Sequence, residues 1–275
     1  MTYCVGMLLE AGLVMIADTR TNAGVDNISS FRKLHLLSEG DGRLVMAATS
    51  GNLSITQMAL GLLDEGLPIE DKERRTKPRD GDEQPEGRRR LADMPSMFRV
   101  TQLVGDAVRI VREDMRPALE KEKISSGISV LVGGRVGGGA LKLYHVYSVG
   151  NFIECQPDQP FLQIGETKYG KPILDRALKF NTPLDEAVKV GLISFDSTIR
   201  SNLAVGRPLD LVVMPADPSL PVIRRRIESA DPYFDDLSAR WSMLLNEARD
   251  TIPDPPFMQA WRDEQAVPLA AVGRR

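Results

Sequence analysis

The chain begins with two short apolar runs, Thr2–Leu9 and Leu13–Asp18, which are separated by Glu10-Ala11-Gly12. Apolar runs of this length, bounded by turn residues, are typical of buried strands. Glycine permits the tight reversal that must lie between them. The pattern therefore predicts a β-hairpin that starts at residue 2.

A second pair of apolar runs, Leu34–Leu37 and Leu44–Ala48, predicts another hairpin around the turn Glu39-Gly40-Asp41-Gly42. Asn52–Leu63 then shows helical spacing, and Asn52 is a favourable N-cap residue. The apolar face of this predicted helix consists of Leu53, Ile55, Met58, Ala59, Leu62 and Leu63.

The pattern predicts a second helix over Ser96–Arg116, and we expect Pro117 to end it because proline lacks a backbone N–H. We expect the glycines within 133–139 to form the turn of a hairpin, and a third helix to start with Thr182 as its cap and Pro183 as its first residue. Further strands are predicted at Gly127–Val132, Ala140–Tyr147, Asn151–Cys155, Phe161–Ile164 and Leu209–Met214, and a last helix at Asp231–Asp250.

Strands and helices thus come in groups and do not alternate one by one along the chain. A strict alternation would favour a doubly wound parallel sheet. The observed grouping predicts an α+β fold in which antiparallel sheets are covered by helices.

Residues 70–90 differ in character from the rest of the chain. They contain seven acidic and eight basic residues and no large hydrophobic residue. Such a segment buries too little apolar surface to order itself, so it predicts an exposed insertion loop. Arg88-Arg89-Arg90 would suit a nucleic acid, but the interspersed acidic residues favour an ordinary solvated loop.

The overall composition is that of a globular protein. The chain has 275 residues, of which 42% are hydrophobic and 27% charged, which excludes disordered and disulfide-framework classes. Its net charge of −3 gives no general attraction to nucleic acid or anionic membranes. No basic residue precedes Arg20, and the first apolar stretch is too short to span a membrane, so we expect a cytoplasmic protein. Two cysteines, Cys4 and Cys155, fit a reducing compartment.

The segment Gly165-Glu-Thr-Lys-Tyr-Gly170-Lys171 has the glycine and lysine spacing of a phosphate-binding loop. Pro172 stands where that motif requires serine or threonine as a magnesium ligand, so a turn between a strand and a helix is the favoured interpretation. A metal site is not expected either, because His35 and His145 have no partners at ligand spacing.

Thr2 is the most informative residue, because it directly follows the initiator Met1. Removal of Met1 would leave a threonine whose own α-amine is free. A hydroxyl needs a nearby base to act as a nucleophile, and an α-amine with a pKa of about 7.7–8.0 suits that task. Such a site also needs a fixed positive charge and a carboxylate to hold it, and Lys33 and Asp18 are the candidates.

Thr2, Ala17-Asp18-Thr19-Arg20, Lys33 and Val45–Gly51 together resemble the N-terminal threonine peptidases of the proteasome β-subunit superfamily, in particular the bacterial Anbu type. The resemblance is densest over residues 2–64. It recurs at Phe161–Arg176 and at Ser201–Gly206.

This resemblance implies a four-layer αββα sandwich of the N-terminal nucleophile hydrolase type. It implies Thr2 as nucleophile and base, Lys33 as the charge that tunes the site, and Asp18 as the residue that orients Lys33. Backbone N–H groups near Ser50 and Gly51 would form an oxyanion hole. The resemblance also implies that the main chain of Thr21 and Asn22 pairs with an extended substrate.

The family usually carries a serine and an aspartate later in the chain, and the matching places here hold Glu166 and Ser201-Asn202. The resemblance further implies peptide-bond hydrolysis without metal or cofactor, on peptide or unfolded protein, and self-association into a ring or spiral. An ATP-dependent unfoldase is a conceivable partner, although no motif identifies one. We expect residues 1–228 to form the peptidase-like domain and 229–275 a helical extension.

Three other functions compete with a threonine peptidase. The first is a self-assembling protein on the same fold with weak or no catalysis, which the changed late residues would suit. The second is an amidohydrolase that acts on small amides, and the third is a nucleotide-binding protein.

Overall fold

The computed structural model describes residues 1–22, 28–40, 42–69 and 87–266 of the chain. It divides into two compact units, Met1–Asp231 and Pro232–Arg275. Most of the charged segment predicted at 70–90 lies outside the described residues. Its last part is described: Arg88 and Arg89 form a short strand, β8, that pairs with β7 (Leu67–Pro68), where a loop was expected.

The first sheet has five antiparallel strands in the order β12-β1-β2-β13-β14. The predicted N-terminal hairpin is confirmed, because the two strands pair from Cys4 opposite Ala17 to Leu9 opposite Gly12. Both strands are almost wholly buried, which explains why their apolar runs are continuous. The strands are β1 (Tyr3–Leu9), β2 (Gly12–Asp18), β12 (Phe161–Gly165), β13 (Leu209–Pro215) and β14 (Ile223–Ile227).

The second sheet also has five antiparallel strands, in the order β11-β10-β9-β6-β5. It faces the first sheet across an apolar core that includes Leu13 and Met15 from one sheet and Met46, Leu131 and Leu143 from the other. The strands are β5 (Leu34–Gly40), β6 (Arg43–Gly51), β9 (Ile128–Arg135), β10 (Lys142–Val146) and β11 (Phe152–Glu154).

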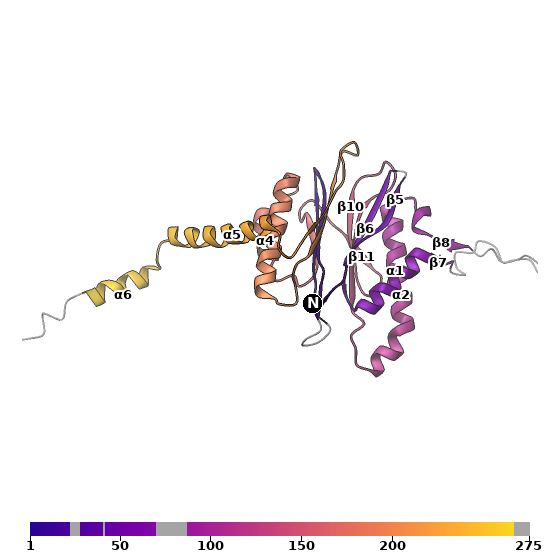
Figure 1. The fold of residues 1–275 in the computed structure, drawn as a ribbon, viewed down its shortest axis with the longest axis horizontal. Coiled ribbons are helices and arrows are strands. Elements are labelled where there is room, and N and C mark those ends of the chain that lie inside the picture. The colour runs from indigo at the N-terminus through magenta and orange to yellow at the C-terminus, as the bar shows by residue number, and fades with distance from the viewer. Residues whose placement is uncertain (23–27, 41, 70–86, 267–275) are drawn as a thin grey trace, which may run out of the picture. The chain divides into compact units, whose positions relative to one another are not determined.

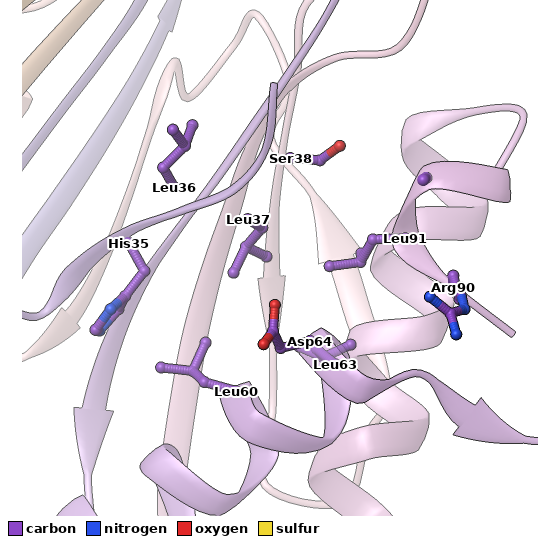
Figure 2. A pocket seen from close by; sticks show the side chains of 10 residues that line it. His35, Leu36, Leu37, Ser38, Leu60, Leu63, Asp64, Arg90 and Leu91 are labelled. Atoms are coloured by element: carbon purple, nitrogen blue, oxygen red, sulfur yellow. The ribbon is translucent and has the colours of Figure 1, made fainter. Parts of the chain in front are cut away.

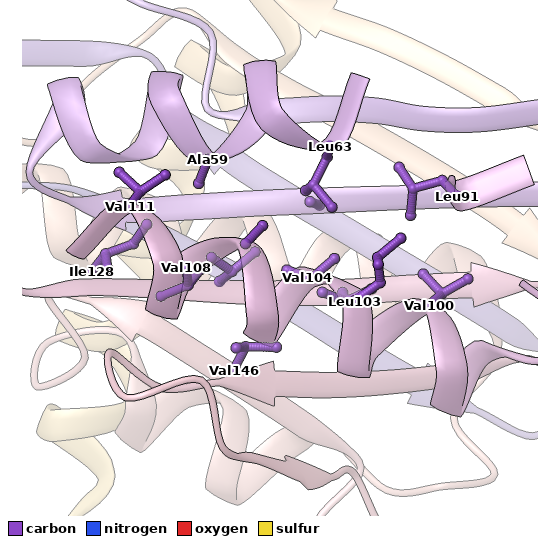
Figure 3. Packing of buried hydrophobic residues seen from close by; sticks show 14 of the residues in the cluster. Ala59, Leu63, Leu91, Val100, Leu103, Val104, Val108, Val111, Ile128 and Val146 are labelled. Atoms are coloured by element: carbon purple, nitrogen blue, oxygen red, sulfur yellow. The ribbon is translucent and has the colours of Figure 1, made fainter. Parts of the chain in front are cut away.

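Two helices, α1 (Leu53–Glu65) and α2 (Met97–Lys121), pack on the outer face of the second sheet. Figure 3 shows their apolar side chains interdigitating, with Val104 and Val108 of α2 close to the strands below. Asn52 caps α1 as predicted, since its side chain accepts hydrogen bonds from the N–H groups of Ser54 and Ile55. A short 3₁₀ helix, Leu91–Asp93, precedes α2.

Helix α4 (Leu184–Ser201) packs on the outer face of the first sheet, with α3 (Lys171–Ala177) beside it. Gly191 allows this close approach, because a Cβ there would meet Ile16 and Met7 of the two central strands. In addition, the ring centroids of Tyr3 and Phe195 lie 4.5 Å apart. Within this unit, helices therefore cover the outward faces of both sheets (Figure 1).

The second unit contains α5 (Pro232–Thr251) and α6 (Pro256–Ala266). The predicted helix at Asp231–Asp250 corresponds to α5, but it is not the last helix, because α6 follows it. The sequence pattern also missed β14 and the small hairpin of β3 (Arg20–Asn22) and β4 (Ile28–Ser30). These elements are short or largely exposed, so their apolar patterns are weak.

Two predicted boundaries are wrong for clear reasons. Pro117 lies inside α2, which continues for another turn, and the burial of Leu119 in that turn compensates for the lost hydrogen bond. Gly133 and Gly134 lie within β9 and not in the turn after it. A Cβ at Gly133 would come within 2.9 Å of Leu13 and Met15, so the glycine lets the sheets approach each other.

The start of α4 also differs from the expectation by one residue. Pro183, and not Thr182, is the N-cap, and the Thr182 hydroxyl instead accepts a hydrogen bond from the N–H of Lys179.

Candidate active site

Thr2 lies just before β1 and is buried, with 8% of its surface exposed. Its carbonyl oxygen accepts a hydrogen bond of 2.6 Å from the N–H of Glu166. This contact follows from the pairing of β1 with β12, which sets Tyr3 opposite Gly165. Gly165 has a φ of +85°, and a Cβ there would overlap the Thr2 carbonyl oxygen, so only glycine fits.

Asp18 and Lys33 form a buried ion pair next to Thr2. The Lys33 Nζ lies 2.8 Å from Asp18 Oδ1 and 2.6 Å from the carbonyl oxygen of Arg20. The same Asp18 Oδ1 accepts a hydrogen bond of 3.0 Å from the N–H of Tyr3. One carboxylate oxygen therefore connects the lysine to the peptide bond that follows Thr2.

Strand ends bring these three residues together, as the sequence predicts. Asp18 is the last residue of β2, the hairpin partner of β1. Lys33 immediately precedes β5, and its carbonyl oxygen accepts a hydrogen bond of 2.9 Å from the N–H of Thr49 on β6. The site thus lies where both sheets end.

The two ionisable side chains of the site, Asp18 and Lys33, are shielded from water. Asp18 is fully buried, and 5% of Lys33 is exposed. Burial raises the pKa of Asp18, while the Lys33 ammonium and the N–H groups of Tyr3 and Gly206 oppose that rise. A paired, buried lysine is a fixed cation that favours a neutral amine and a negative oxygen near it.

Ser50 and Gly51 end β6 on the same side of the molecule, directly after Thr49. Ser50 is buried and Gly51 has a φ of +109°. A Cβ at Gly51 would overlap the carbonyl oxygen of Gly127, so the end of β6 also requires glycine. Thr21 and Asn22 belong to β3, which follows Asp18 after one residue.

Glu166 and Asn202 meet, although they are far apart in the sequence. The Asn202 Nδ2 donates to Glu166 Oε2 at 3.1 Å, and the N–H of Lys168 donates to Glu166 Oε1 at 3.2 Å. Glu166 is buried, with 8% of its surface exposed. Ser201, in contrast, is the exposed last residue of α4 and takes no part in this contact.

Sequence reasoning did not single out Tyr3 and Ser194, two buried residues behind Thr2 whose hydroxyl oxygens lie 2.6 Å apart. The sequence did carry one signal, since Tyr3 is a polar aromatic residue in an otherwise aliphatic strand. A buried tyrosine hydroxyl normally requires a hydrogen-bond partner.

A cavity of about 300 Å³ lies between β5, α1 and the 3₁₀ helix, away from these residues (Figure 2). The residues that line it include His35, Leu60, Asp64 and Arg90. Within the described ranges, no group of histidine, cysteine or acidic side chains is arranged to hold a metal ion. No helix in the same ranges is long and apolar enough to cross a membrane.

No protein-family model and no curated protein matches the chain. Solved structures do match. The helical assembly of the Anbu complex from Pseudomonas aeruginosa has 42% identity and a TM-score of 0.78, covering 92% of this chain and 98% of that one. Anbu (ancestral beta-subunit) from Yersinia bercovieri has 38% identity, the same TM-score and the same coverage. An Anbu mutant from Hyphomicrobium sp. strain MC1 has 40% identity, a TM-score of 0.78 and coverage of 93% and 99%.

The paired sheets and these matches define a proteasome-like β-subunit fold. Since the identity is well above 30% over nearly the whole length of each relative, the chain belongs to the Anbu family.

Proposed function

We propose that this protein is a threonine endopeptidase whose nucleophile is Thr2, exposed when Met1 is removed. The observation that carries the proposal is the buried Lys33–Asp18 pair, which is hydrogen-bonded to the peptide bond that follows Thr2. A pair of buried charges costs stability unless it is compensated. Its position beside Thr2, the residue that removal of Met1 would expose, supports a chemical role for it.

In the proposed reaction, the α-amine of Thr2 takes the proton from its own hydroxyl as the oxygen attacks the carbonyl carbon of the substrate. The amine then gives this proton to the leaving nitrogen, and an acyl-enzyme ester remains. Water, activated by the same amine, hydrolyses the ester and releases Thr2. The Lys33 cation lowers the cost of the developing negative charge on the threonine oxygen, and Asp18 holds that cation in place.

Backbone N–H groups at Ser50 and Gly51 would bind the oxyanion, because donors fixed at the end of a strand need no reorganisation when charge develops. The main chain of Thr21 and Asn22 in β3 would form hydrogen bonds with the main chain of an extended substrate, as in strand-addition recognition. Peptides and unfolded proteins supply such extended segments, and an ATP-dependent unfoldase could deliver them.

Glu166 would orient the freed amine, at one of the two places where the family usually carries a serine and an aspartate. Its N–H already bonds the Thr2 carbonyl, and Asn202 fixes its carboxylate. This arrangement supports catalysis over the alternative of an inactive assembly protein.

We further propose that the chain assembles with copies of itself into a spiral or ring, since a relative of 42% identity forms a helical assembly. The fold would be the four-layer αββα sandwich of N-terminal nucleophile hydrolases, with 1–228 as the catalytic domain and 229–275 as a helical extension. Two free, buried cysteines support a cytoplasmic location.

Intact-mass measurement before and after treatment with an epoxyketone probe tests the proposed chemistry. For the wild-type protein, we expect a mass that lacks one methionine before treatment and the gain of one probe molecule per chain after it. The Thr2→Ala variant is the matched control, because alanine also permits removal of Met1 but offers no hydroxyl. Retention of Met1 in mature protein would refute the proposal, and a processed chain that takes no probe would favour the inactive assembly protein. A panel of peptides and small amides distinguishes an endopeptidase from an amidohydrolase.

A further inference from the structure

The segment Gly165–Gly170 has glycines at both ends, and the sequence alone gave them no function beyond a turn. It connects β12 to α3 and carries Glu166. Its first end is fixed at Thr2, since the N–H of Glu166 bonds the Thr2 carbonyl and Gly165 leaves room for that oxygen.

The far end of the segment is fixed at Tyr3, the residue after Thr2. The Ser194 hydroxyl donates to the Gly170 carbonyl at 3.0 Å and lies 2.6 Å from the Tyr3 hydroxyl. A Cβ at Gly170 would overlap both hydroxyl oxygens, so glycine is required here as well. Gly165 therefore allows close approach to Thr2, and Gly170 allows close approach to Tyr3, the first residue of β1.

The hydrogen bonds at this end have one consistent direction. Gln163 Nε2 donates to the Tyr3 oxygen at 2.6 Å, and each hydroxyl has a single proton to give. Because Ser194 donates to Gly170, Tyr3 must donate to Ser194. The chain thus runs from Gln163 through Tyr3 and Ser194 to the Gly170 carbonyl, and each bond polarises the next.

The two hydroxyl groups of this chain of hydrogen bonds are shielded from water. Tyr3, Ser194 and the neighbouring Phe195 are fully buried. Burial raises the pKa of Tyr3 to about 12, so its hydroxyl keeps its proton. The hydroxyl pair joins the start of β1 to α4, residues that are 191 positions apart.

We propose that Gly165–Gly170 is a positioning segment, which holds the Glu166 carboxylate in register with Thr2, and that the buried Tyr3–Ser194 hydroxyl pair anchors its far end. The catalytic part of this inference rests on the proposed function. Tyr3 and Ser194 touch no substrate and act through the segment. The near-match to a phosphate loop is thereby explained without a phosphate: the lysine of the motif, Lys171, pairs with Asp175 at 2.7 Å.

Two variants that each remove one hydroxyl, Tyr3→Phe and Ser194→Ala, test the anchor. Thr198→Val is the matched control, because Thr198 is equally buried on α4 and its hydroxyl donates only to the Ser194 carbonyl within the helix. Hydrogen exchange of peptides that span 165–171 is measured in all proteins. We expect faster exchange in this region for Tyr3→Phe and Ser194→Ala and unchanged exchange there for Thr198→Val.

Kinetics on a peptide substrate provide the second readout. We expect kcat to fall about ten- to a hundredfold in the two hydroxyl variants, with KM changed less than about twofold, because small misplacement of a reacting group costs rate and not binding. Unchanged exchange over 165–171 would overturn the proposal. Faster exchange with a loss of kcat no greater than that of Thr198→Val would also overturn it.

The exchange measurement does not depend on catalysis. If wild type neither hydrolyses peptides nor takes the epoxyketone probe, the proposed function fails, and the exchange data still decide whether the hydroxyl pair anchors the segment. Gly170→Ala adds a third test, since its Cβ enters the space of both hydroxyls. It should give the same local increase in exchange.

Discussion

Replacement of Lys33 by methionine tests the central electrostatic argument. The change keeps an unbranched apolar stem but removes the ammonium that lies 2.8 Å from Asp18 Oδ1. Asp18 is then a buried carboxylate, fully shielded from water, whose remaining polar contacts include the N–H of Tyr3. Breaking a buried pair by removing one partner costs about 3–5 kcal/mol, because the other charge is left uncompensated.

At about 2–4 °C per kcal/mol for a unit of this size, the Lys33→Met variant should melt roughly 10 °C below wild type. The Asp18→Asn variant leaves Lys33 buried with the carbonyl of Arg20 as a partner, so it should also be destabilised. The double variant contains neither charge. It should therefore be more stable than either single variant, while all three take no epoxyketone probe.

Urea unfolding at one fixed protein concentration measures the free energies for this cycle, since assembly would make the stability concentration-dependent. Effects that simply add in the double variant would refute the reasoning, as would a cost below about 1 kcal/mol for Lys33→Met, a value typical of exposed pairs. A single variant that still takes the probe would show that the pair is structural and not part of the chemistry.

Three further predictions follow from burial and backbone geometry. Burial raises the pKa of Cys155 to about 12 and raises that of Cys4 as well, so iodoacetamide at pH 8 should alkylate neither thiol until urea unfolds the protein. Burial lowers the pKa of His35 and His145, so below about pH 6.5 the unfolded chain binds more protons than the folded chain. The urea midpoint should therefore fall as the pH drops below about 6.5, and it should fall less in variants that replace either histidine by glutamine. Gly51→Ala should abolish peptide hydrolysis and lower the melting temperature, because its Cβ has no room. Normal kinetics would contradict the assignment of the oxyanion donors to the end of β6.

Much of the local structure could be predicted from the sequence. Continuous apolar runs such as Tyr3–Leu9 indicate buried strands, and Asn52 marks the start of α1, because these signals depend only on neighbouring residues. Pro117 misled the prediction, since its effect depends on whether the next turn of α2 can bury Leu119. That burial is decided by packing and not by the proline itself.

The sequence by itself indicated which residues to expect at the candidate site. Thr2 and Asp18 lie at the ends of the two strands of one hairpin, so short-range order brings them together, whereas Lys33 precedes a strand of the second sheet and reaches Asp18 because the two sheets pack on each other. Only the tertiary structure decided how the site is supported. Tyr3 meets Ser194 through a helix folded over the first sheet, and Glu166 meets Asn202 across the same fold. No local pattern encodes such contacts, because they depend on which surfaces of distant elements pack and how closely glycines let them approach.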